Sequence, residues 1–145
     1  MATRRAQAVW EGDLASGEGT ADLESGLATG LPVNWRARTE GGEQTSPEEL
    51  LAAAHASCFA MALSHELAEA GNAPERLTVS AAVSFEPKGD GFAVTTSKLE
   101  VRGVVPGVDA DAFAQAADGA AKGCPISAAL SGNVDISVEA ELESG

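Results

Sequence analysis

The sequence predicts an α+β fold in which antiparallel sheets pack around long central helices. Three observations support this prediction: short alternating segments come first, a long apolar helical pattern begins near residue 46, and alternating segments return from Leu77 onward. The chain has 145 residues, of which 44% are hydrophobic, and this is the size of one globular domain. We therefore expect a single domain over residues 1–145.

The first part of the chain is predicted to form short strands separated by glycines. Ala6, Ala8 and Trp10 alternate on one face of a first strand, and a turn over residues 12–19 leads into a second strand. A third short strand is predicted over residues 33–39.

The long helix has clear start and stop signals. Ser46 is the predicted N-cap, Pro47 takes the first helical position, and Glu49 completes a capping box. Gly71 supplies the left-handed residue that ends the helix after about Ala70.

The rest of the chain alternates between strands and helices. Asp109 is the predicted N-cap of one helix, and Pro125 begins another. We expect antiparallel neighbours in the sheet rather than parallel crossovers. The predicted elements are strands over residues 77–85, 92–104 and 134–142, and helices over residues 109–123 and 125–130.

The long helix is unusually apolar. Between Leu50 and Leu63 its only polar residues are His55 and Ser57, and none is charged. A helix that is apolar on every side is buried on every side, and a small sheet covers only one of them. We therefore expect a homodimer with this helix at its centre. The alternative is a monomer in which the helix that begins at Asp109 covers the other side.

Composition argues against several functions. Lys and Arg total 9 against 22 Asp and Glu, which gives a net charge of −13 and disfavours binding to nucleic acid or to an anionic membrane. No apolar run reaches the roughly 20 residues of a membrane span. No apolar stretch follows Arg4 and Arg5 as a signal peptide would require. We expect a cytoplasmic protein.

Two cysteines are candidates for chemistry. Cys58 lies within the long helix, where a thiol is often only a small buried apolar side chain. Cys124 precedes Pro125 at the start of a short helix, where free amides and the helix dipole favour a thiolate, unless the residue merely fills the cap position. If the two thiols meet, one can become a sulfenic acid and the other can close a disulfide.

A thiolate in an apolar helix needs a nearby cation. Arg36 and Arg38 precede the long helix, and a carboxylate of Glu48 or Glu49 could orient a guanidinium. Solvated loop arginines and capping glutamates are the alternative, and Glu49 fits the capping role better than Glu48 does.

The two histidines do not indicate a metal site. His55 and His65 lie at i−3 and i+7 from Cys58, a spacing that lacks the usual paired zinc ligands. We expect both histidines in the core or in positions that support the site, with no metal and no other cofactor.

Two motifs carry a family resemblance over essentially the whole chain. The segment SPEELLAAAHASCFAMALS at Ser46–Ser64, together with GCPIS at residues 123–127, resembles the OsmC/Ohr family of organic hydroperoxide reductases. The WEGD, RTEG and VPGVDA segments resemble the OsmC branch of that family.

The resemblance implies an intertwined α+β homodimer with two active sites at the subunit interface. It also implies thiol peroxidase activity on organic hydroperoxides in oxidative and osmotic stress defence. Matching motif positions make Cys58 the peroxidatic cysteine, Cys124 the resolving cysteine, Glu48 the catalytic glutamate and Arg38 its arginine. Arg36 is the fallback for Arg38. This assignment reverses the helix-cap argument, which favours Cys124 as the more acidic thiol.

The implied mechanism needs no cofactor. Arg38, oriented by Glu48, holds Cys58 as a thiolate, and the thiolate attacks the peroxide to leave a sulfenic acid. Cys124 condenses with that sulfenic acid, and a dithiol such as a dihydrolipoyl group reduces the disulfide. An apolar pocket for the peroxide could include the following residues, although core packing is the expected role of most of them: Leu51, Ala54, Phe59 and Met61.

Two other function classes remain open at this point. One is a dimeric, non-catalytic binding module for an apolar ligand, in which both thiols stay reduced under stoichiometric organic peroxide. The other is a peroxide sensor that acts on a partner protein, and turnover with a dithiol would separate this sensor from an enzyme.

Overall fold

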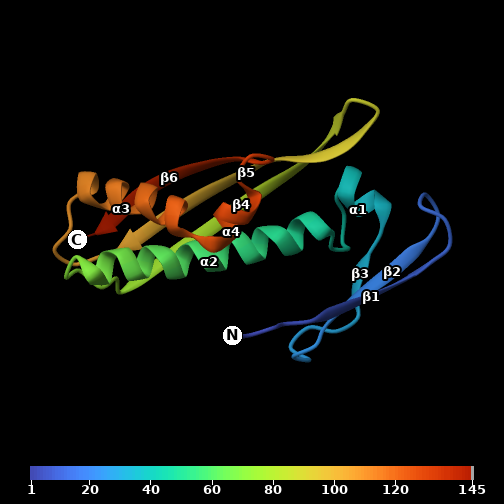
Figure 1. The fold of residues 1–145 in the computed structure, drawn as a ribbon, viewed down its shortest axis with the longest axis horizontal. Coiled ribbons are helices and arrows are strands. Elements are labelled where there is room, and N and C mark those ends of the chain that lie inside the picture. Colours follow the sequence, from blue (N-terminus) through green and yellow to red (C-terminus); the bar gives the residue numbers. More distant parts are fainter. Residues whose placement is uncertain (145) are drawn as a thin grey trace. The chain divides into compact units, whose positions relative to one another are not determined.

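The computed structural model describes residues 1–144 and divides the chain into two compact units, Met1–Leu50 and Leu51–Gly145. Figure 1 shows the helices and strands of each unit. The α+β class predicted from the sequence is confirmed, because each unit has its own three-stranded sheet and each contains helical segments.

The first unit is built on a small antiparallel sheet in the order β1-β2-β3. Gly19 lies opposite Trp10, and a Cβ at Gly19 would lie 2.8 Å from a ring carbon of Trp10. The indole can therefore lie across this part of the sheet only because the facing residue has no side chain. The strands are β1 (Ala6–Glu11), β2 (Glu18–Leu23) and β3 (Leu31–Val33).

The predicted strand over residues 33–39 is wrong beyond Val33. The chain instead forms a short helix, α1 (Trp35–Thr39). The side chain of Asn34 accepts a hydrogen bond from the amide of Ala37 at 2.8 Å, which satisfies one of the free amides of the first turn. This cap makes the helix the better state for a segment whose alternation was too short to specify a strand.

The long helix α2 (Pro47–Glu69) begins and ends where the sequence predicts. The Ser46 hydroxyl accepts a hydrogen bond from the amide of Glu49 at 3.1 Å, and Gly71 has a φ of 88°. In a full capping box the Glu49 carboxylate would accept from the Ser46 amide. Here that carboxylate instead accepts a hydrogen bond from the Thr45 hydroxyl at 2.5 Å.

The second unit has a mixed sheet in the order β4-β5-β6. The strands β4 (Arg76–Lys88) and β5 (Gly91–Val104) form a long antiparallel hairpin, whereas β6 (Asp135–Ser144) runs parallel to β5. The expectation of antiparallel pairing is thus wrong for β6. The two helices α3 (Ala110–Gly123) and α4 (Pro125–Leu130) return the chain to the starting end of the sheet, which makes a parallel neighbour possible (Figure 1).

The apolar core lies in the second unit, where α2 and α3 run beside each other (Figure 1). Phe113 is fully buried, and a Cβ at Gly103 would lie 2.6 Å from its ring, so the ring packs directly on the β5 backbone. Burying one such side chain contributes about 2 to 3 kcal/mol. The core also includes Phe59, Leu63, Leu67, Leu99, Val101, Ala117, Ala120 and Cys124.

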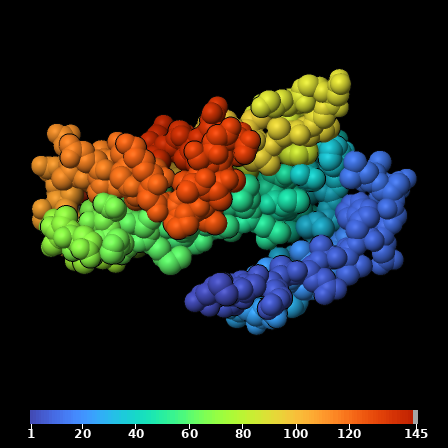
Figure 2. Space-filling view, viewed as in Figure 1, coloured from blue at the N-terminus to red at the C-terminus, as the bar shows by residue number. Residues whose placement is uncertain are grey.

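One side of α2 remains open in the single chain. His55, Phe59 and Leu63 are fully buried, whereas Met61 is 68% exposed. Figure 2 shows α3 and α4 covering the near face of the second unit, with α2 along one edge. Among residues 1–144, α2 is the one helix long and apolar enough to cross a membrane, and its buried face packs into the core.

Candidate active site

The two cysteines meet in the second unit. Cys58 lies on α2 and Cys124 at the N-cap of α4, 66 residues apart, yet their sulfurs are 3.0 Å apart. Both are free thiols; Cys124 is fully buried and Cys58 is partly exposed. The separation is about 1 Å longer than a disulfide bond, so a small shift of either side chain would allow a bond to form.

The position of Cys124 follows from the junction between two helices. Its amide donates to the Ala120 carbonyl at 2.8 Å, which closes α3, and its carbonyl accepts from the Ala128 amide at 3.0 Å, which opens α4. Pro125 fits the first position of α4 because that position needs no amide hydrogen bond. The sequence expectation of a thiol at the start of this helix is confirmed.

The surroundings shift the pKa values of the two thiols in opposite directions. Burial raises the pKa of Cys58, and its hydrogen bond with Cys124 raises it further. Burial also acts to raise the pKa of Cys124, but hydrogen bonds from Cys58, Ser127 and the Ile126 amide together outweigh it and lower that pKa. One proton is enough to bridge the two sulfurs. Within the second unit the negative charge is therefore favoured on Cys124.

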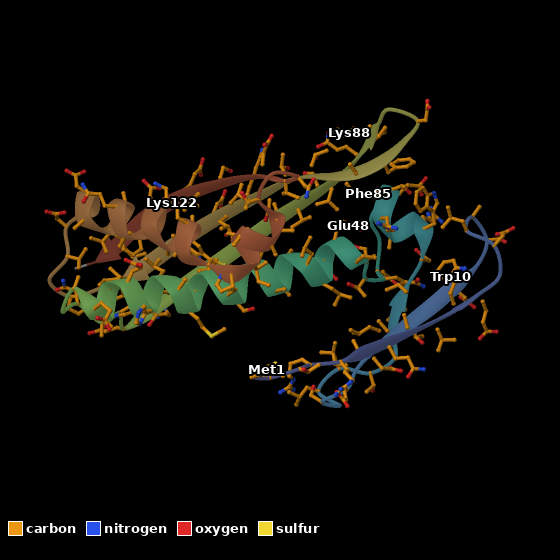
Figure 3. All side chains as sticks on the ribbon, viewed as in Figure 1. Met1, Trp10, Glu48, Phe85, Lys88 and Lys122 are labelled. Carbon is orange, nitrogen blue, oxygen red and sulfur yellow. The ribbon has the colours of Figure 1, made fainter. Side chains whose placement is uncertain are left out.

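The first unit holds the charged pair that the sequence singles out. Arg38 Nη2 donates to Glu48 Oε1 at 2.7 Å, and Arg38 Nε lies 3.2 and 3.3 Å from the two carboxylate oxygens. The Glu48 side chain is 8% exposed, and the Arg38 guanidinium carbon lies 5.9 Å from the centre of the Trp35 ring. Figure 3 shows Glu48 at the first turn of α2. The arginine is thus fixed by a two-point ion pair and by an aromatic ring.

The helical form of residues 35–39 decides between the two candidate arginines. A strand would place Arg36 and Arg38 on the same face, whereas a helix turns them well apart. Arg36 pairs instead with Glu40 at 2.7 Å, and its side chain is 80% exposed. The structure therefore places Arg38, and not Arg36, on Glu48.

His55 is buried beside the thiols and is fully hydrogen bonded. Its Nδ1 lies 2.7 Å from the Ser97 hydroxyl on β5, and its Nε2 lies 2.8 Å from the Ser127 hydroxyl on α4. His65 is exposed. Neither serine was predicted to lie at the site, although Ser127 belongs to the GCPIS motif. The sequence feature that could have predicted these partners is a histidine on an otherwise apolar helix, since a buried histidine needs buried polar partners.

The remaining candidates have mixed surroundings. Phe59 is fully buried in the core, Leu51 and Ala54 are partly exposed, and Met61 is largely exposed. Within residues 1–144, no three His, Cys, Asp or Glu side chains are grouped in a way that could hold a metal ion.

Comparison with known proteins places this chain in one family. A sequence model of OsmC-like proteins matches residues 40–139, which include Glu48, Cys58 and Cys124, while Arg38 lies just before them. The peroxiredoxin OsmC of Escherichia coli is 42% identical over 141 residues, which cover 97% of this chain and 97% of that protein. The organic hydroperoxide resistance protein of Xanthomonas axonopodis pv. citri is 32% identical over 99 residues, which cover 68% of each chain.

A solved structure agrees in fold. The crystal structure of the organic hydroperoxide resistance protein OhrB of Bacillus subtilis matches with a TM-score of 0.74 and 28% identity. The match covers 94% of this chain and 98% of that chain.

Proposed function

This chain belongs to the OsmC family and is a peroxidase, and we propose that it reduces organic hydroperoxides with Cys58 as the attacking thiol and Cys124 as the resolving thiol. The observation that carries this proposal is the approach of two free sulfurs to 3.0 Å. The names of the Xanthomonas and Bacillus relatives support organic hydroperoxides as the substrate class.

In the first step, the Cys58 thiolate attacks one oxygen of the peroxide. The O–O bond breaks, the sulfur is oxidised to a sulfenic acid, and the other oxygen leaves as an alkoxide that takes a proton from solvent. The product is an alcohol. No metal or organic cofactor takes part in this step.

The first step requires a cation near Cys58, and we assign this role to Arg38. The pKa of Cys58 is raised by burial, so within its own unit Cys58 is the less acidic of the two thiols. A guanidinium facing the sulfur would reverse that order, since an opposite charge favours the ionised form. The two-point ion pair with Glu48 supports the proposal, because it fixes both the position and the direction of the guanidinium.

In the second step, Cys124 condenses with the Cys58 sulfenic acid and releases water. A dithiol then returns both cysteines to thiols and itself becomes a disulfide. We propose a dihydrolipoyl group as this dithiol. We place the reaction in the cytoplasm, where other thiols keep cysteines reduced between turnovers.

We further propose that the working form is a homodimer. In Met1–Leu50, which the structure describes throughout, no apolar side chain is buried, and Trp10, Leu14 and Leu27 are among those exposed. In the second unit, Met61 is exposed on the most apolar helix of the chain. Apolar groups exposed on both units support an assembly in which a second copy covers them.

The decisive experiment is a thiol count with intact mass before and after one equivalent of cumene hydroperoxide. The wild type should lose both thiols and about 2 Da, as an internal disulfide requires. The Cys124→Ser variant should gain about 16 Da as a sulfenic acid at Cys58, and Cys58→Ser should not react quickly.

Other outcomes would overturn parts of this proposal. Fast oxidation that survives in Cys58→Ser but is lost in Cys124→Ser would reverse the two roles. Thiols that stay reduced in all three proteins would reject the peroxidase mechanism and favour a binding module for apolar ligands. Oxidation without turnover in the presence of a dithiol would indicate a sensor.

A further inference from the structure

The steps proposed so far leave a buried imidazole without a role. His55 is fully buried on α2, and its two ring nitrogens bridge Ser97 on β5 and Ser127 on α4 at 2.7 and 2.8 Å. These contacts tie together three elements of the second unit. One of them, α4, begins at Cys124.

The ring nitrogen of His55 that carries the proton determines whether each serine hydroxyl donates or accepts its hydrogen bond with the ring. Burial lowers the pKa of His55, so the ring is neutral near pH 7. A neutral imidazole donates through one nitrogen and accepts through the other. If Nε2 carries the proton, Ser127 accepts from the ring and its own hydroxyl proton is free. If Nδ1 carries the proton, Ser127 must give its hydroxyl proton to the ring.

Ser127 is also next to the resolving thiol. It is the third residue of α4, one helical turn after the N-cap residue Cys124, and its hydroxyl and amide are among the groups whose hydrogen bonding lowers the pKa of Cys124. A hydroxyl has a single proton. Ser127 can therefore donate to the Cys124 sulfur only when His55 carries its proton on Nε2.

We propose that His55 is a positioning residue for disulfide closure: by bridging Ser97 and Ser127 in its Nε2-protonated form, it holds the Ser127 hydroxyl as a hydrogen-bond donor to the Cys124 sulfur. The proposal rests on the roles assigned above to Cys58 and Cys124. It adds a residue that touches neither peroxide nor sulfur and acts through Ser127.

The step that His55 assists is balanced without any further reagent. The Cys124 thiolate attacks the sulfur of the Cys58 sulfenic acid, so an S–S bond forms and the S–O bond breaks. The Cys124 sulfur is oxidised and the Cys58 sulfur is reduced. The proton given up by the Cys124 thiol ends on the departing hydroxide, which leaves as water. His55 keeps its proton, and Ser127 stabilises the thiolate before the attack.

Four variants separate this role from simple core packing. Ser127→Ala removes the donor to Cys124, and His55→Leu removes the bridge. His55→Gln keeps one donor and one acceptor, so it should preserve the bridge. Ser57→Ala is the matched control, because the Ser57 hydroxyl is exposed and bonds to the Ala53 carbonyl of its own helix. Each protein receives one equivalent of cumene hydroperoxide, and intact mass follows the sulfenic acid and the disulfide over time.

We expect the two chemical steps to respond differently. In Ser127→Ala and His55→Leu, Cys58 should be oxidised at the wild-type rate, but the disulfide should form about 10- to 100-fold more slowly, as expected for the loss of a hydrogen bond to a charged group. The sulfenic acid should accumulate in these two variants. His55→Gln and Ser57→Ala should behave like the wild type.

Three results would overturn the proposal. They are wild-type disulfide closure in Ser127→Ala, closure in His55→Gln as slow as in His55→Leu, and equal slowing of both steps. If the wild type itself does not react with peroxide, the proposed function fails instead. Side-chain nitrogen NMR of His55 in the reduced protein remains decisive even then. A proton on Nε2 supports the proposal and a proton on Nδ1 rejects it.

Discussion

The two residue pairs of the candidate site are held in place by different forces. The Cys58–Cys124 pair lies in the unit that contains the whole buried apolar core, and Cys124 belongs to that core. The Arg38–Glu48 pair lies in Met1–Leu50, where the buried side chains are those of Ser46 and Glu48 and no apolar side chain is buried. Packing therefore fixes the thiols, whereas hydrogen bonds, an ion pair and a helix cap fix the cation.

From this difference we infer that the two units have separate roles: the second positions the sulfurs, and the first supplies the cation proposed to lower the pKa of Cys58. Both sulfurs belong to the second unit, and their environment raises the pKa of Cys58 and lowers that of Cys124. The proposed peroxidase needs the opposite order, and the cation assigned to reverse it belongs to the first unit. Disulfide geometry and thiol reactivity should therefore be separable by mutation.

The largest effect is expected from a substitution in the first unit, measured by the oxidation rate of a thiol in the second unit. Arg38→Met should slow oxidation of Cys58 by about 100-fold, because it removes the preorganised charge that is proposed to stabilise the Cys58 thiolate. Arg36→Met is the matched control. Since Arg36 forms an exposed pair with Glu40, its loss should change the rate by less than about 2-fold. Stopped-flow measurement of thiol oxidation checks both rates.

The outcomes of the arginine variants discriminate between assignments. Equal slowing in the two variants would argue for a general effect of positive charge rather than a fixed pair. A slow Arg36→Met protein with a normal Arg38→Met protein would move the role to the fallback arginine. In both variants the sulfurs should still form a disulfide when a strong oxidant is added, because the core that positions them is unchanged.

A smaller effect is expected at the exposed apolar surface that a second copy of the chain is proposed to cover. Met61→Glu places a charge on the exposed apolar side of α2 and should weaken the dimer by about 10- to 50-fold in Kd. Light scattering at micromolar concentration should then fall from about 29 kDa, twice the 14.6 kDa of one chain, toward the mass of the monomer.

The control for the dimer is a charge on another exposed helical position. Ala114→Glu on α3 introduces the same side chain and should leave the mass of the dimer unchanged. A wild-type mass near 14.6 kDa would reject the dimer itself. The apolar side chains exposed on the first unit would then require another partner.

How far the sequence predicts this structure depends on the range of the interactions. Both ends of α2 were predicted because Ser46 and Gly71 act on residues within one turn. The helix α1 was missed because a single cap at Asn34 outweighed a weak alternation. The parallel pairing of β6 was missed because strand order depends on how α3 and α4 pack, which no local pattern encodes.

For the candidate site too, local features could be predicted from the sequence, whereas contacts between distant residues could not. Periodicity placed Cys58 on a helix, and the proline after Cys124 placed that residue at a helix start. Only the family resemblance implied that the two thiols act together. Arg38 could not be chosen over Arg36 without knowing that residues 35–39 are helical. The partners of His55 were also out of reach, since Ser97 and Ser127 lie 42 and 72 residues away in the chain.

The smallest expected effect compares two helix caps with matching geometry, one in each unit. Asn34 accepts from the Ala37 amide and Asp109 from the Ala112 amide, both at 2.8 Å. Asp109→Ala should lower the free energy of unfolding of the second unit by about 1 kcal/mol, because α3 packs into its core. Asn34→Ala should leave that free energy unchanged within about 0.3 kcal/mol. It should instead speed hydrogen exchange at Ala37 and slow oxidation of Cys58, since α1 carries Arg38.

Denaturant melts and amide exchange measure the two effects. If both variants lower the same unfolding transition equally, the two units unfold as one, and the cation is held by the same packing as the thiols.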